Sequence, residues 1–157
     1  MTDRAATTMT PSIPTIVRRL NPLVQRLLRL GVPMGPNVLL TVRGRKSGLE
    51  RTFPVAILEV GEGTYVFSPF GEVDWVRNLR AAGAATIRQA RRTTAMTARE
   101  LTPEIAAPLL EAGLRDAMGM PFFGSMIAGW YGIDRASTTA DFLAAARRHP
   151  GFELLPA

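Results

Sequence analysis

Apolar residues near the beginning of the chain recur every three or four positions, which is the period of an amphipathic α-helix. They are Ile13, Ile16, Val17, Leu20, Leu23, Val24, Leu27 and Leu28, with arginines between them. The pattern predicts a basic helical segment over residues 11–31. Asn21-Pro22 is typical of a helix start, so we expect a break there and a second helix that ends at Gly31. Such a segment packs on the fold, covers a substrate or contacts a membrane surface.

The middle of the chain alternates between β-rich runs and glycine-bearing turns. These runs predict strands over residues 38–43, 51–60 and 64–68. Because the turns between them are short, the strands are expected to pair as an antiparallel meander. A helical pattern follows over residues 74–82, and Gly83 stands where a helix C-terminus favours glycine. Two further strands are predicted as a hairpin that turns at Arg91-Arg92, over residues 86–90 and 93–101.

The last third contains helices and one more strand. Thr102-Pro103-Glu104 is a helix-start signature and predicts a helix to about Met118. Residues 122–131 are aromatic without a clear period, and Asp141 is expected to cap a last helix through Arg148. Residues 152–155 are expected to close the sheet. This order of elements predicts an α+β fold, a mostly antiparallel barrel with flanking helices, rather than alternating βαβ units.

Composition limits the possible functions. A chain of 157 residues with 46% hydrophobic residues is expected to form one domain, over residues 32–157, after an unstructured stretch of about ten residues and the helical segment. The absence of cysteine and the single His149 argue against disulfides, thiol catalysis and a metal site. No apolar run approaches the ~18 residues that span a bilayer, so the expected location is the cytoplasm.

The positive charge is concentrated at one end of the chain. Residues 1–51 carry nine Arg/Lys against two acids, and the rest carry ten against eleven. An anionic partner is therefore expected to contact the N-terminal third, and charge alone leaves nucleic acid, a membrane surface and a small phosphorylated ligand open. Few aromatic residues lie among these arginines, which argues against nucleic acid.

Three segments offer candidate chemistry. Gly44-Arg45-Lys46-Ser47-Gly48, with Arg51 nearby, is either a solvated hairpin tip or an anion site built from cations, a hydroxyl and turn amides. Trp75 either stacks on a planar ligand or packs in the core, with Asp74 as a helix cap. A third cluster is either an apolar substrate pocket or core, and consists of Met118, Met120, Phe122, Phe123, Met126, Trp130 and Tyr131.

Few residues suggest acid–base catalysis. Tyr131 is the hydroxyl-bearing aromatic of the third cluster and can give a proton or a hydrogen bond to an acceptor oxygen. His149 is interpreted as a surface or packing residue. The carboxylates are dispersed and no Ser/His/Asp arrangement is evident, which gives hydrolases no support. Redox chemistry with a hydride-carrying cofactor needs no such constellation.

Taken together, the motifs resemble those of the deazaflavin-dependent nitroreductase family, whose members use coenzyme F-420. The likeness runs from about residue 38 to residue 101 and resumes at the C-terminus. It rests on Leu40-Thr41-x-x-Gly44-Arg45-Lys46-Ser47-Gly48-x-x-Arg51-Thr52-x-Pro54, Asp74-Trp75-Val76-Arg77-Asn78-Leu79, Thr97-Ala98-Arg99-Glu100-Leu101 and His149-Pro150-x-Phe152.

This resemblance implies a split β-barrel that binds F-420. It implies that the anionic part of the cofactor is bound by Arg45, Lys46, Ser47, Gly48, Arg51 and Thr52. It implies that the ring and its linker are bordered by Phe67, Ser68, Trp75, Val76, Arg77 and Asn78. Members reduce quinones, nitroaromatics or activated alkenes. Pro69 stands where the nitroimidazole-reducing members have a lysine, so the acceptor is left open.

The sequence therefore predicts an oxidoreductase that passes hydride from reduced F-420 to an apolar acceptor, with Tyr131 or water as the proton source. Two alternatives remain: an FMN enzyme on the same barrel, and a non-enzymatic module that binds anions or membranes. The basic helical segment is expected to associate weakly with anionic lipid, which would place the protein at the inner face of the membrane.

Overall fold

The structure, a computed structural model, describes residues 13–157. The stretch expected to be unstructured, residues 1–10, lies outside this range. The helices are α1 (Thr15–Arg29), α2 (Asp74–Ala82), α3 (Pro103–Met118), α4 (Phe123–Tyr131) and α5 (Thr139–Arg148). The strands are β1 (Asn37–Arg43), β2 (Glu50–Val60), β3 (Gly63–Phe67), β4 (Ala84–Gln89), β5 (Arg92–Glu100) and β6 (Gly151–Pro156). Apart from α4, which lies in a stretch without a clear period in the sequence, their order is the one that the sequence predicted.

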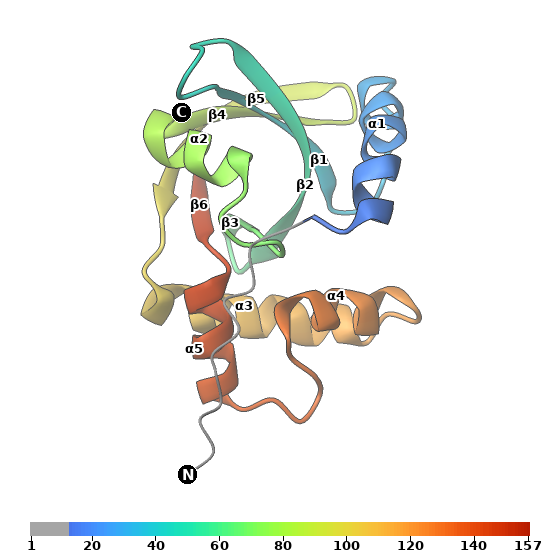
Figure 1. The fold of residues 1–157 in the computed structure, drawn as a ribbon, viewed down its shortest axis with the longest axis vertical. Coiled ribbons are helices and arrows are strands. Elements are labelled where there is room, and N and C mark those ends of the chain that lie inside the picture. The colour runs from blue at the N-terminus through green and yellow to red at the C-terminus, as the bar shows by residue number, and fades with distance from the viewer. Residues whose placement is uncertain (1–12) are drawn as a thin grey trace.

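The six strands form a closed antiparallel barrel in the order β1-β2-β3-β6-β5-β4 (Figure 1). Pairing of β1 with β4 closes it, from Leu39↔Arg88 to Thr41↔Thr86. The C-terminal strand β6 lies between β3 and β5, two strands far from it in the chain. The prediction of a mostly antiparallel α+β barrel is confirmed, and the predicted last strand joins β3 to β5.

Two hydrophobic cores hold the molecule together. The first fills the barrel, where alternate residues of β1 point inward and α2 contributes Trp75, Val76 and Leu79. The second lies among α3, α4 and α5, which pack together beneath the barrel in Figure 1. Phe67, at the end of β3, is buried in the second core, so the end of this strand joins the two layers.

Helix α1 lies against the outside of the barrel on β1 and β2 (Figure 1). The predicted break at Pro22 is wrong, because one continuous helix runs through it. Packing of the inner face, centred on the buried Leu28, stabilises the helix despite the amide that proline lacks. The predicted end is confirmed: Gly31 has φ +80°, and its amide and that of Val32 donate to carbonyls of the last turn.

Smaller differences concern caps and turns. Thr138, not Asp141, is the N-cap of α5, and Asp141 completes a capping box with it. The β4–β5 hairpin turns one residue earlier than expected, at Ala90-Arg91, with Ala90 at φ 52°. The N-cap of α2 is Val73, so Asp74 is the first residue of the helix rather than its cap. Along the described part of the chain, no helix is long and apolar enough to cross a membrane.

Candidate functional site

The fold brings two of the predicted motifs together. The β1–β2 hairpin of residues 44–49 lies against the start of α2, although some thirty residues separate them in sequence. The Oδ1 atom of Asn78 accepts hydrogen bonds from the Arg45 backbone amide at 3.2 Å and from Arg45 Nη1 at 2.8 Å. Asn78 is 4% exposed, so the buried amide of α2 fixes the position of the hairpin tip.

The hairpin tip keeps hydrogen-bond donors available. Its turn is closed by bonds from Gly44 N to Leu49 O at 2.7 Å and from Gly48 N to Gly44 O at 2.8 Å. Ser47 Oγ accepts from Leu49 N at 3.2 Å, which leaves its hydroxyl proton to donate. Within residues 13–157, the amides of Lys46 and Ser47 donate to no protein acceptor. Turn amides in this state are suited to an anion.

The backbone geometry favours glycine at both ends of this turn. A Cβ atom on Gly44 would stand 2.9 Å from Ser47 Oγ and 3.1 Å from Leu49 O, so a side chain at this position would crowd the turn. Gly48 has φ +69°, a left-handed conformation that costs other residues energy. The sequence pattern of two glycines around Arg45-Lys46-Ser47 therefore has a geometric cause.

Exposed cationic side chains stand on the hairpin, at the start of β2 and on α2. Lys46, Arg51 and Arg77 are all exposed, and in the part of the chain that the structure describes none of them forms an ion pair. Arg45 is partly buried, with 25% of its side chain exposed, and stands 3.5 Å from Asp74 Oδ1. The charge and the donors of this site favour a phosphate or a carboxylate.

Thr52, which follows the hairpin tip in β2, makes two contacts that the sequence did not predict. Its Oγ1 is 2.9 Å from Thr41 Oγ1 across the strand pair. Its carbonyl accepts a hydrogen bond at 3.3 Å from Gln25 Nε2 of α1. The contact between the two threonines could have been predicted, because both point outward from paired strands of the predicted hairpin. The contact of Gln25 with β2 could not, because no local pattern indicates that α1 packs on this strand.

The residues expected to border a ring are mostly buried. Trp75 is 7% exposed and packs in the barrel core, with its ring 6.3 Å from that of Phe152. Val76 and Ser68 are fully buried, and Phe67 belongs to the second core. Core packing, one of the two interpretations of Trp75, is what the structure shows. The contact of these residues with a cofactor stays a prediction.

Ser68, His149 and Tyr131 form a buried group where β3 ends. His149 Nδ1 donates to the carbonyl of Ser68 at 3.0 Å, and Ser68 Oγ donates to Gly71 O at 2.6 Å. The rings of Tyr131 and His149 meet edge to face at 4.7 Å. Burial lowers the pKa of His149 and raises the pKa of Tyr131. His149 is thus a packing residue, and the hydroxyl of Tyr131 stays protonated.

The third cluster of the sequence is divided. Met118 and Tyr131 are buried in the second core, whereas Met120, Phe122 and Met126 are exposed. Trp130 packs instead against Phe70, with the ring centroids 5.1 Å apart. Core packing, one of the two interpretations of this cluster, holds for Met118 and Tyr131, and a substrate pocket lined by its other members stays a prediction.

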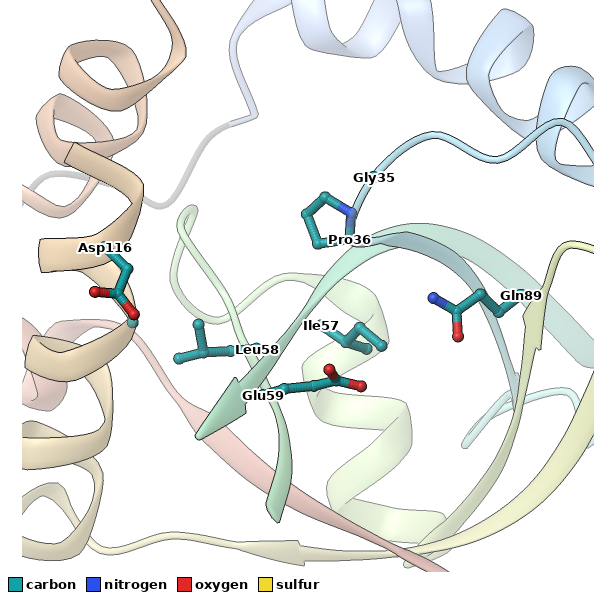
Figure 2. Close-up of a pocket in the computed structure, with 8 residues that line it drawn as sticks. Gly35, Pro36, Ile57, Leu58, Glu59, Gln89 and Asp116 are labelled. Carbon is teal, nitrogen blue, oxygen red and sulfur yellow. The ribbon is translucent and has the colours of Figure 1, made fainter. Parts of the chain in front are cut away.

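A pocket of about 390 Å³ opens between the barrel and α3 (Figure 2). It is lined by Gly35, Pro36, Ile57, Leu58, Glu59, Gln89, Gly113 and Asp116. None of the predicted site residues lines it, and the pairing of Asn37 with Ala56 and of Arg43 with Glu50 puts it at the opposite end of the β1–β2 pair from the hairpin tip. Its charged residues are both carboxylates, which repel an anionic ligand, so the hairpin is the better candidate for the cofactor.

The closed antiparallel barrel with helices on its outside places the chain in the class of split β-barrel proteins. Residues 15–117 match the model of the F-420H(2)-dependent quinone reductase family. The chain belongs to this family and is an F-420-dependent oxidoreductase. No curated protein matches its sequence.

Solved structures share the fold at low sequence identity. A heme storage protein from Vibrio cholerae, HutZ, is 16% identical with a TM-score of 0.52, over 88% of this chain and 90% of that one. An FAD-binding protein from Mesorhizobium loti is 14% identical with a TM-score of 0.50, over 85% and 88%. An F-420-H2-dependent reductase, FDR-A, is 20% identical with a TM-score of 0.49, over 76% and 93%.

Proposed function

We propose that this oxidoreductase binds reduced F-420 with its anionic part on the hairpin of residues 44–52 and reduces a quinone-like acceptor. The main support for this proposal is that hydrogen bonds between Arg45 and Asn78 join this hairpin to α2. The two segments carry the family motif and, together, most of the exposed cations near the tip.

The residues fit an anionic cofactor. Lys46, Arg51 and Arg77 supply exposed positive charge, and the amides of Lys46 and Ser47 are available donors. Gly48 and Thr52 complete the cradle on the side of β2. When bound, reduced F-420 supplies the hydride. The chain's own part is to bind and orient it, since a cofactor of this kind brings its own reactivity.

The ring is proposed to lie where β3 ends, beside α2. Phe67 and Ser68 at the end of β3 and Trp75 and Val76 of α2 are buried, so the surface proposed to receive the ring rests on packed side chains rather than mobile ones. His149 holds the carbonyl of Ser68 at 3.0 Å, which fixes the shape of this surface.

The acceptor is proposed to be a quinone, with nitroaromatics and activated alkenes as further candidates. Tyr131 is the proposed donor of a hydrogen bond to the acceptor oxygen, and water is the alternative proton source. Because burial raises the pKa of Tyr131, a hydrogen bond that keeps its proton is favoured over full proton transfer.

FMN is the alternative cofactor, since it also carries a phosphate and a tricyclic ring. Fluorescence titration with F-420 and with FMN separates the two. Tight binding of F-420 with weak binding of FMN, together with reduction of a soluble quinone by reduced F-420, is the expected result. Tight binding of FMN alone would refute the proposal.

A membrane-surface role of α1 completes the proposal. The exposed side of this helix carries Ile16 (69% exposed), Leu20 (50%) and Leu23 (55%), and the helix has arginines but no acidic residue. Apolar side chains beside cations suit an anionic lipid surface, which is where a lipid-soluble quinone is found.

Co-sedimentation with anionic vesicles tests this role. We expect the wild type to bind and Leu20→Gln/Leu23→Gln to bind less. Leu155→Gln removes an apolar side chain, 43% exposed, from β6 and serves as the control. Equal sedimentation of all three proteins would leave α1 as a packing element only.

A further inference from the structure

Two arginines, Arg80 of α2 and Arg45 of the neighbouring hairpin, contact carboxylates in different ways. Arg80 donates to both Glu72 and Glu100 at distances between 2.6 and 2.9 Å, and these hydrogen bonds raise its pKa. Among residues 13–157, the one carboxylate beside Arg45 is that of Asp74, whose Oδ1 atom lies 3.5 Å from both Nη1 and Nη2. The first arrangement is a closed network of short hydrogen bonds, and the second consists of two long contacts to one oxygen.

Asp74 is able to leave Arg45 without disturbing it. The Asp74 side chain is 70% exposed, so its carboxylate can turn to water at little cost. Arg45 would stay in place, because Asn78 Oδ1 binds both its guanidinium, at 2.8 Å, and its backbone amide. The structure therefore holds a positioned cation whose counter-anion is weakly attached.

We propose that Asp74 sets the affinity of the anion site: its carboxylate is the counter-anion of Arg45 in the free protein, and an anionic group of the cofactor displaces it. The inference rests on the proposed function, because it takes residues 44–52 as the binding place of that group. Asp74 occupies donors of Arg45 that the incoming anion needs, so the contact between the two side chains has to break before the anion binds Arg45. Since an exposed ion pair is weak, Asp74 lowers the affinity rather than preventing binding.

Titration with F-420 tests the proposal in a double-mutant cycle of Asp74→Asn and Arg45→Ala. At low salt, Asp74→Asn is expected to bind F-420 about two- to fivefold more tightly than the wild type, the range that corresponds to an exposed ion pair. The gain is expected to shrink as salt rises and to disappear when Arg45 is Ala. Glu62→Gln removes an exposed charge at the β2–β3 turn and is expected to leave the affinity unchanged.

The outcomes separate this inference from the proposed function. If the wild type binds F-420 but Asp74→Asn does not tighten binding, the role of Asp74 is overturned and the cofactor site stands. A gain that persists without Arg45, or that Glu62→Gln reproduces, also overturns it, since a general change of charge would then explain the result. A wild type that does not bind F-420 overturns both. Thermal melts confirm folding, with a small loss expected for Asp74→Asn because an acid favours a helix N-terminus.

Discussion

Lys46 and Arg45 are expected to contribute to cofactor binding in different ways, although they are neighbours in one turn. Lys46 is exposed and makes no ion pair among the described residues, so Lys46→Ala removes a charge and little else. Arg45→Ala also removes the 2.8 Å hydrogen bond to the buried Asn78. The backbone amide of residue 45 remains as a donor to Asn78 Oδ1, so this buried oxygen stays satisfied.

The magnitudes follow from these contacts. A well-formed hydrogen bond between charged groups contributes about 1.5 to 3 kcal/mol, which exposure and salt reduce. The double variant Arg45→Ala/Lys46→Ala is therefore expected to bind F-420 at least about tenfold more weakly. Loss of the bond to Asn78 is expected to lower the free energy of unfolding by about 0.5 to 1.5 kcal/mol in Arg45→Ala. Lys46→Ala is expected to melt like the wild type.

The assay is F-420 titration at low and high salt, with thermal melts of the same samples. Wild-type affinity is expected to weaken with salt, and the double variant is expected to depend on salt less. Arg147→Ala, which removes an exposed cation from α5, is the matched control. If the double variant is folded, with a loss of stability no larger than that expected for Arg45→Ala, and binds F-420 as tightly as the wild type, the placement of the cofactor on this hairpin is wrong.

Three further predictions concern the rest of the fold. Because burial lowers the pKa of His149, the free energy of unfolding is expected to be highest above about pH 6.5 and to fall as the pH drops below it. His149→Asn should flatten the dependence of Tm on pH between 7.5 and 5.5, and an unchanged slope would contradict this. Gly151→Ala would press a Cβ into the ring of Phe67 and is expected to cost about 1–3 kcal/mol, whereas Gly129→Ala, with nothing within 4 Å, should not lower Tm. Tyr131→Phe is expected to slow quinone reduction at unchanged F-420 affinity, and unchanged turnover would remove Tyr131 from the mechanism.

The sequence alone determined the elements and their order, with the exception of α4. The strands were predicted from β-rich runs bounded by glycine-bearing turns, and Gly83 and Gly31 marked the ends of two helices, because residue preference and turn chemistry are local properties. The motif of residues 44–52 also marked the candidate anion site, since its cations, hydroxyl and glycines are adjacent in the chain, and the binding of an anion there stays a prediction. Pro22 was misinterpreted because the packing that carries α1 through it comes from strands elsewhere in the sequence.

Only the tertiary structure decided which of these elements meet. The insertion of β6 between β3 and β5, the closure of β1 on β4 and the docking of the hairpin on Asn78 all join residues distant in the chain. The same is true of Asp74, which sequence suggested as a helix cap and the fold places beside Arg45. These long-range contacts depend on how the two hydrophobic cores pack together, and no local pattern of residues specifies that packing.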